Sequence, residues 1–278
     1  MVCRICGEPA CPAKGAQQRP LVWRCRDCGF EWVDREALGS TFEPPQYTGY
    51  DYNARIDAWF ERMRPQYRRG LAARLARTLG EGAAGGAFLD IGCANGEYMR
   101  VAAEAGLATT AGVEVDAAAA RRASRHGPVW ADVADVPGTF DVVQIKNVLS
   151  NIDDLETFLA TSLQRLRPGG YLYLDVLNEA SLTALLRRAL LDGLRIGQGN
   201  RRYGHLRPPY VINGFTPEAV RRLLHRQGLT LRHLRTAHNG SDEVPYSATL
   251  RTRLLGGLGS ALGRGPMLVA DAQRPADG

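Results

Sequence analysis

The chain has 278 residues, of which 45% are hydrophobic, and its formal net charge at pH 7 is +6. This length allows one well-formed hydrophobic core and a small additional module. The longest apolar runs are shorter than a membrane span and the N-terminus lacks a secretory pattern, so we expect a cytoplasmic protein that does not enter a membrane. The charge comes mostly from arginine, which can mark a phosphate-binding surface or reflect a GC-rich genome; we favour the second explanation.

Two cysteine pairs near the N-terminus predict a metal site. The four residues are Cys3, Cys6, Cys25 and Cys28, and a glycine follows each pair. Four thiolates suit tetrahedral zinc and leave no open coordination position, so we expect structural zinc in a ribbon formed by residues 1–38. Cys11 lies between the pairs and is interpreted as a spare thiol.

Residues 39–84 are predicted to connect this ribbon to the main domain. Apolar residues recur at helical spacing in two groups, at 56–63 and at 71–79, which predicts two helices before the first strand. The tyrosine-rich segment 47–52 precedes them, and it either packs against the core or lies over a ligand pocket.

The segment 87–96 predicts a strand, a tight turn and the start of a helix. Asp90 and Gly92 follow the apolar strand, and Gly96 stands just before the helical pattern. The glycine spacing differs from that of a dinucleotide-binding loop, so a diphosphate is not the expected ligand. A second apolar strand ends in Glu114, where an acid can hold the two hydroxyls of a ribose. Together these residues suggest a nucleoside ligand without a diphosphate.

These residues resemble motif I and the ribose-binding acid of class I S-adenosylmethionine-dependent methyltransferases. The family pattern is D-x-G-x-G-x-G, and Ala94 stands at its middle glycine. The resemblance implies S-adenosylmethionine as the cofactor, with Asp132 accepting from the adenine amino group and Asn147 beside the cofactor. The family's usual Glu-His pair is replaced by Ser150-Asn151, so a histidine base at that point is absent. The implied cofactor-binding residues are Asp90, Gly92, Cys93, Ala94, Gly96, Glu114, Val115, Asp132, Val133 and Asn147.

Residues 85–278 are predicted to form the methyltransferase domain. Seven apolar strands alternate with helices, which indicates an α/β fold: a Rossmann-like, mostly parallel sheet with helices on both faces, preceded by the zinc ribbon. The resemblance implies a hairpin-like pairing of the last two strands. Thr216 and Pro217 are the expected N-cap and first residue of a late helix. The predicted strands cover 87–89, 111–116, 129–132, 140–145, 171–176, 229–235 and 267–270.

The segment 197–213 is polar, basic and aromatic, with no clear period. A loop of this length inside a compact domain is more often functional than idle. We predict that His205 acts there as a general base and that Tyr210 contributes to the acceptor site; otherwise His205 is an ordinary solvated loop residue.

Three functions are compatible with these patterns. The favoured one is methyl transfer to a small natural-product or sugar-like acceptor. The second is methylation of an RNA base, but residues 1–38 carry a net charge of only +1, from six basic and five acidic side chains. A nucleic-acid partner needs a broad basic track, so RNA is the less favoured substrate. The third is a non-methylating protein of the same fold that binds S-adenosylmethionine.

Overall fold

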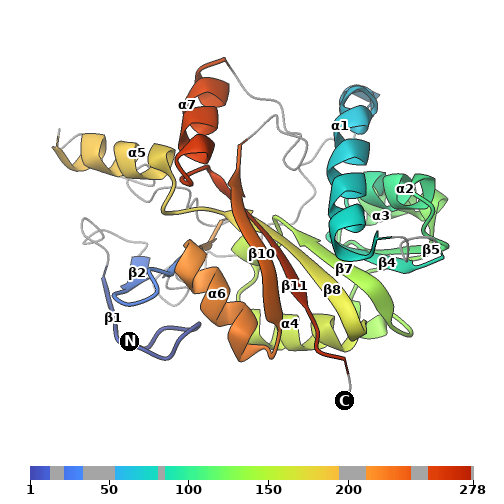
Figure 1. Cartoon of the computed structure of the whole chain (residues 1–278), viewed down its shortest axis with the longest axis horizontal. Coiled ribbons are helices and arrows are strands. Elements are labelled where there is room, and N and C mark those ends of the chain that lie inside the picture. Colours follow the sequence, from blue (N-terminus) through green and yellow to red (C-terminus); the bar gives the residue numbers. More distant parts are fainter. Residues whose placement is uncertain (13–21, 34–53, 81–84, 194–210, 239–249, 277–278) are drawn as a thin grey trace.

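The computed structural model describes residues 1–12, 22–33, 54–80, 85–193, 211–238 and 250–276. Its main body is one seven-stranded sheet (Figure 1). The strands are β4 (Ala87–Ile91), β5 (Thr109–Val113), β6 (Val129–Trp130), β7 (Phe140–Lys146), β8 (Leu166–Leu177), β10 (Thr230–Ala237) and β11 (Met267–Gln273). Their order is β10-β11-β8-β7-β4-β5-β6, and β11 runs opposite to the other six strands, so that its pairings with β10 and β8 are antiparallel. The predicted Rossmann-like sheet and its terminal antiparallel pairing are confirmed.

Helices cover both faces of the sheet (Figure 1). They are α1 (Ala54–Thr78), α2 (Glu97–Glu104), α3 (Ala117–Ala123), α4 (Leu155–Gln164), α5 (Leu182–Gly193), α6 (Pro217–Arg226) and α7 (Leu250–Ala261). Successive strand residues point to opposite faces, so Phe88 and Val142 pack with α1 and α2. Leu89 and Val143 pack on the other face with α4 and α6. The sheet is therefore buried on both sides, as a parallel sheet requires.

The prediction of two helices before the first strand is wrong, because α1 is a single helix with Pro65 inside it. An interior proline costs a helix about 3 kcal/mol. Burial of a continuous stripe with a spacing of four residues, packed against α2 and β4, offsets this cost. The stripe consists of Met63, Tyr67, Leu71, Leu75 and Leu79.

Two further elements bear on the sequence predictions. Thr216 caps α6 as expected, since its Oγ1 accepts a hydrogen bond from the Ala219 amide at 3.1 Å. The segment 167–170 lies before the strand predicted at 171–176, and in the structure it belongs to β8. At Gly170 an added Cβ would lie 2.9 Å from the Asp141 carbonyl oxygen, so the glycine permits β8 to approach β7 closely.

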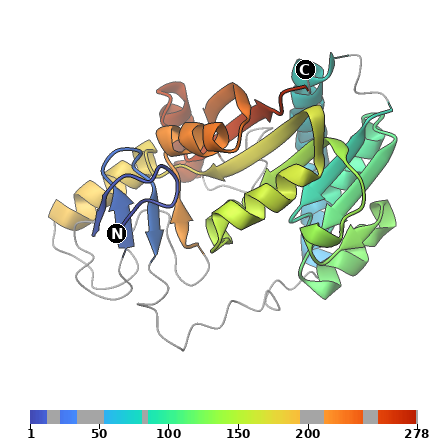
Figure 2. The ribbon, with the colours of Figure 1, turned by 90° about the horizontal axis from the view of Figure 1, so that it is seen from below.

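The N-terminal residues form a small sheet of their own. It contains β1 (Ala10–Pro12), β2 (Val22–Cys25) and β3 (Glu31–Val33), paired antiparallel. Its fourth strand is β9 (Asn213–Gly214), which comes from the segment just before α6. Figure 2 shows this blue ribbon at the opposite end of the molecule from the green β5–β6 region.

The ribbon packs onto the main body through aromatic side chains. Phe30 and Trp32 form an apolar patch of the ribbon, in which both are buried and their rings stack at 5.5 Å between centroids. The ring centroid of Phe30 also lies 5.2 Å from that of Phe215 in the main body. The apolar patch is therefore part of the seam between ribbon and sheet. The proposed boundary at 38/39 falls outside the described residues. Among the described helices, none is both long and apolar enough to cross a membrane.

Candidate functional site

A pocket of about 520 Å³ opens at the carboxyl ends of β4, β5, β6 and β7. At this point the strand order reverses, since β4 has β5 on one side and β7 on the other. Open α/β sheets bind ligands at such switch points, and this volume lies within the usual range for small-molecule sites. The pocket is lined by Ile91, Gly92, Ala94, Val113, Glu114, Val115, Asp116, Ala131, Asp132, Val133, Lys146, Asn147, Val148, Asn151, Ile152 and Phe158.

The structure brings most of the expected cofactor residues together in this lining. Those present are Gly92, Ala94, Glu114, Val115, Asp132, Val133 and Asn147. Asp90 of β4 and the loop residues Cys93 and Gly96 do not line the pocket. Cys93 is buried against Met99 and Ala123 between α2 and α3, so its thiol contributes to packing.

The two loop glycines are required for different reasons. Gly92 has φ +80°, and an added Cβ would lie 2.3 Å from Val148 Cγ2. Gly96 has φ +82°, and its Cβ would lie 2.9 Å from the Cα of Ala123. Gly96 therefore allows α3 to pack against the start of α2.

Glu114 organises the loop that contains these glycines. Its Oε2 accepts a hydrogen bond from the Ala94 amide at 2.9 Å, and its Oε1 accepts one from the Asp116 amide at 2.8 Å. Burial raises the pKa of this carboxyl, while the backbone donors oppose the shift. Each carboxylate oxygen has two acceptor positions. The side chain can therefore hold the loop and still accept hydrogen bonds from ligand hydroxyls in the pocket.

The pocket lining also contains apolar side chains and a further acid. Val115 is 68% exposed although it is apolar, and it faces the pocket together with Ile152 and Phe158. Such surfaces suit the faces of an aromatic base. Asp132 lines the same pocket, and its Oδ1 caps the short turn at 133–135 by accepting a hydrogen bond from the Ala134 amide at 2.8 Å.

Asp90 lies beneath the glycine loop and is buried. Its Oδ1 accepts a hydrogen bond from Gln144 Nε2 at 3.0 Å. Burial raises the pKa of Asp90 to about 7, although the Gln144 hydrogen bond favours the ionised form. The aspartate thus supports the loop from below the pocket and changes charge near neutral pH.

Lys146 belongs to the pocket and was not predicted from the sequence. It forms a buried ion pair with Asp175, and its Nζ lies 5.3 Å from the Tyr98 ring centroid. Asp175 also pairs with Arg74 of α1 at 2.9 Å, and Arg74 pairs in turn with Asp271 of β11. This buried network ties α1 to the sheet. Its sequence signal is an aspartate inside each of two apolar strands, at 175 and at 271.

The expected acceptor-site residues lie in the part of the chain left undescribed. His205 and Tyr210 both fall within 194–210. Ser150 and Asn151, at the place of the family's Glu-His pair, belong to the short 3₁₀ turn η5 (Leu149–Asn151), and Asn151 lines the pocket.

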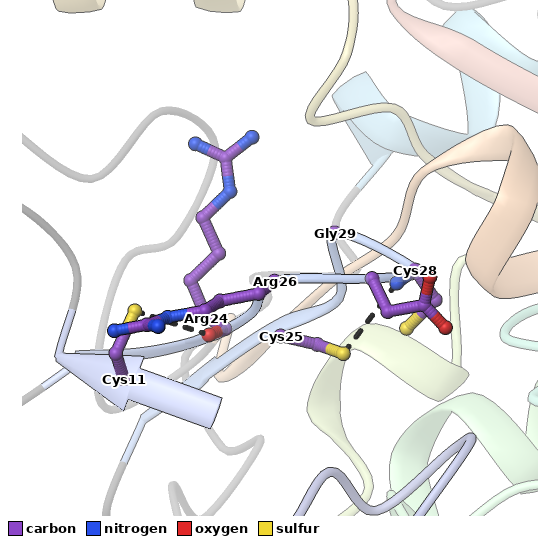
Figure 3. A pocket seen from close by; sticks show the side chains of 7 residues that line it. Cys11, Arg24, Cys25, Arg26, Cys28 and Gly29 are labelled. Carbon is purple, nitrogen blue, oxygen red and sulfur yellow. Dashed lines mark hydrogen bonds between the residues drawn. The ribbon is translucent and has the colours of Figure 1, made fainter. Parts of the chain in front are cut away.

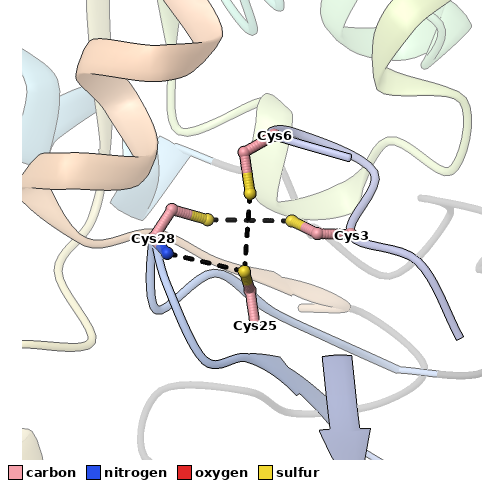
Figure 4. A group of neighbouring side chains, drawn as sticks. All are labelled: Cys3, Cys6, Cys25 and Cys28. Carbon is pink, nitrogen blue, oxygen red and sulfur yellow. Dashed lines mark hydrogen bonds between the residues drawn. The ribbon is translucent and has the colours of Figure 1, made fainter. Parts of the chain in front are cut away.

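The four expected cysteines form a second candidate site (Figure 4). Their sulfurs all lie within 4.8 Å of one another, with 3.7 Å between Cys3 and Cys28 and 3.5 Å between Cys6 and Cys25. A tetrahedron with zinc–sulfur bonds of about 2.3 Å has sulfur–sulfur edges of about 3.8 Å, so the donor set fits zinc. The hydrogen bond from Cys28 lowers the pKa of the Cys3 thiol to about 5, which favours a thiolate there.

Backbone amides complete the surroundings of this cluster. The Ile5 amide donates to Cys3 Sγ and the Cys28 amide donates to Cys25 Sγ, both at 3.4 Å. Cys11 is outside the cluster: its thiol donates to the Arg24 carbonyl at 3.8 Å, and Figure 3 shows it apart from Cys25.

Comparison with known proteins is consistent with the geometry of the pocket. A family model described as a methyltransferase domain matches residues 61–234, more than half of the chain. A curated relative from Caulobacter vibrioides, named ubiquinone biosynthesis O-methyltransferase, is 35% identical over 124 residues, which cover 38% of this chain and 48% of that protein. The chain thus spans about half the length of this curated relative.

Two solved structures share the fold. An S-adenosylmethionine dependent methyltransferase from Mesorhizobium loti superposes with a TM-score of 0.50 at 21% identity, covering 74% of this chain and 100% of that one. Magnesium protoporphyrin IX methyltransferase from Synechocystis, with bound SAH, gives a TM-score of 0.52 at 16% identity, covering 79% of this chain and 87% of that one. At these identities the likeness concerns the fold alone.

Proposed function

The chain belongs to the family of methyltransferase domains, and from this premise we propose that it transfers a methyl group from S-adenosylmethionine to a small-molecule acceptor. The observation that carries this proposal is the pocket at the switch point, with Glu114 at the end of β5 and the glycine loop at the end of β4. When bound, the cofactor supplies an electrophilic methyl group on a sulfonium. The chain's task is to bind it, exclude water and align the acceptor.

Within this proposal each wall of the pocket has a separate task. Glu114 accepts hydrogen bonds from the ribose hydroxyls, and Asp132 accepts one from the adenine amino group. Val115 and Phe158 supply apolar surface for the adenine ring. Gly92 and Ala94 leave room for the methionine arm.

The four-cysteine site is proposed to hold one structural zinc ion. The residues are Cys3, Cys6, Cys25 and Cys28, which together fill a tetrahedral shell. A closed shell offers no position for substrate, so the metal's task is to fold the ribbon.

Ion pairs between the ribbon and the main body favour a small acceptor over RNA. Asp27 pairs with Arg222, Arg4 pairs with Asp153 at 3.5 Å, and Glu31 pairs with Arg188 at 2.9 Å, so each of these ribbon charges meets the main body. Nucleic-acid binding needs cations that remain available to phosphates. The name of the Caulobacter relative also supports a small acceptor.

The acceptor class is tested by following a labelled methyl group. The zinc-loaded protein is incubated with methyl-labelled S-adenosylmethionine and either a mixture of phenolic, sugar-like and amine metabolites or structured RNA. We expect label in a small product and only weak, salt-sensitive RNA binding, near the 10⁻⁴–10⁻⁶ M typical of non-specific contacts. Label in RNA, with much tighter binding, would reverse the assignment.

His205 and Tyr210 are proposed to contribute to the acceptor site. The His205→Ala variant should lose about 10²- to 10⁴-fold in turnover if His205 acts as a general base, with cofactor affinity intact. Unchanged turnover would show that it is an ordinary loop residue.

A further inference from the structure

The turn η5 forms one wall of the proposed cofactor pocket, because Asn151 and its neighbours Val148 and Ile152 line it. Two carbonyl oxygens of this region, those of Leu149 and Ile152, accept hydrogen bonds from the side-chain amide of Asn213. The Leu149 contact measures 3.0 Å. One side chain from β9 therefore holds the backbone at both ends of the turn.

A main-chain hydrogen bond beside this contact joins the same two segments. The Ile212 amide donates to the Ser150 carbonyl at 2.8 Å, so β9 and η5 are joined by main-chain and side-chain bonds. Asn213 itself is fully buried. A buried carbonyl that loses its hydrogen-bond donor is destabilised, so the turn depends on these bonds for its position.

The same residue belongs to the ribbon's sheet. Asn213 is the antiparallel partner of Trp32 in β3, and the Val33 amide donates to the Ile212 carbonyl at 2.9 Å. β3 begins three residues after the metal ligand Cys28. Thr216 provides a second connection, since its hydroxyl donates to the Cys28 carbonyl. The metal cluster and the pocket wall are thus connected through one short strand.

A ribbon of this size is expected to need its metal to hold β3 in register. We propose that Asn213 is a positioning residue that couples occupancy of the four-cysteine metal site to affinity for the cofactor. The inference rests on the proposed cofactor and metal. Linkage requires the coupling to be reciprocal: metal tightens cofactor binding, and cofactor tightens metal binding by the same factor.

Two measurements on the full chain test this coupling. The affinity for zinc is measured by equilibrium competition with a chromophoric chelator, with and without saturating S-adenosylhomocysteine, and the affinity for S-adenosylhomocysteine is measured by calorimetry before and after zinc removal. For the wild type we expect S-adenosylhomocysteine to tighten zinc binding, and zinc to tighten S-adenosylhomocysteine binding, each on the order of ten-fold.

Asn213→Ala should bind zinc, because all four ligands remain. Two ratios should fall close to one in this variant: the zinc affinity with and without S-adenosylhomocysteine, and the S-adenosylhomocysteine affinity with and without zinc. The matched control is Asn178→Ala, which also removes a buried amide, one that donates to the Gly265 carbonyl at 2.7 Å. The control should keep the wild-type ratios, which separates coupling from general destabilisation.

The outcomes separate this inference from the proposed function. Zinc-loaded wild type that binds no S-adenosylhomocysteine would overturn both. Wild type that binds it with both ratios equal to one would overturn the coupling alone, even if Asn213→Ala failed to fold. Ratios that persist unchanged in a folded Asn213→Ala variant would assign the coupling to other residues and refute the role of Asn213.

Discussion

The carboxylate of Glu114 accepts a hydrogen bond from the backbone amide of Ala94 at 2.9 Å. The end of β5 thereby fixes the loop that follows β4. The acid proposed to bind the ribose is also the group that shapes the loop beside it, so ligand recognition and loop geometry depend on the same side chain.

The backbone conformation of Ala94 predicts that replacement by glycine and by valine will affect stability differently. Ala94 has φ +51°, where glycine is unstrained and a β-branched residue is strongly disfavoured. Ala94→Gly should change the unfolding free energy by less than about 1 kcal/mol, whereas Ala94→Val should lower it by about 1–3 kcal/mol. Ala131→Val is the control, since this exposed pocket residue has no positive φ. Equal stabilities of the two valine variants in urea unfolding would contradict the strain argument.

Asp90 predicts a pH dependence of stability. Its folded-state pKa of about 7 lies above the ordinary value of 3.8, so the folded protein retains a proton that the unfolded chain has lost between these values. Stability from this group is present below about pH 4 and is lost as the pH rises towards 7, by roughly 4 kcal/mol in total. In Asp90→Asn the side-chain oxygen can still accept the hydrogen bond from Gln144. Because the amide does not titrate, this variant does not lose stability as the pH rises. Without cofactor, the variant should therefore gain stability relative to wild type between pH 5 and 8. A constant difference in urea unfolding across this range would contradict the prediction.

The buried pair of Lys146 and Asp175 predicts a large cost for removing one partner. Lys146→Met leaves a buried carboxylate with fewer partners and should destabilise the fold by about 3–5 kcal/mol. Adding Asp175→Asn should recover part of that loss, because Arg74 keeps Asp271. The more exposed ion pair between Arg100 and Glu104 is the control. Arg100→Met should lower the free energy of unfolding by less than about 1 kcal/mol. A double variant whose loss equals the sum of the single losses would show that the pair is not coupled.

The cysteine cluster predicts one zinc ion per chain. Cys25→Ser should release the metal and unfold the ribbon, whereas Cys11→Ser should retain it, because Cys11 lies outside the cluster. Metal analysis of purified protein measures both. Zinc-free wild type, or full zinc content in Cys25→Ser, would exclude this site.

The sheet could be predicted from the sequence because its strands are short apolar runs that alternate with amphipathic helices. The pocket loop could also be predicted, since Asp90 and Gly92 follow one predicted strand, Glu114 ends another, and the carboxyl ends of parallel strands meet at one edge. Periodicity did not predict that α1 would continue through Pro65, because the stabilising contacts come from α2 and β4, which are distant in sequence.

The seam between ribbon and main body had no local signal. β9 has two residues and joins β3 from about 180 positions away, so no pattern in either segment identifies the pairing. The Lys146 network was missed for a similar reason: ionisable residues inside apolar strands indicate burial of charge, but the partner residues depend on tertiary packing.

Isothermal calorimetry with S-adenosylhomocysteine tests the central assignment most directly. The zinc-loaded wild type should bind one equivalent, and Glu114→Gln should bind about 10- to 100-fold more weakly, because charge-assisted hydrogen bonds to the ribose are worth about 1.5–3 kcal/mol. The exposed acid at 135 provides the control, and Asp135→Asn should keep wild-type affinity. No binding to wild type, or equal affinities for wild type and Glu114→Gln, would contradict the assignment of this pocket to the cofactor.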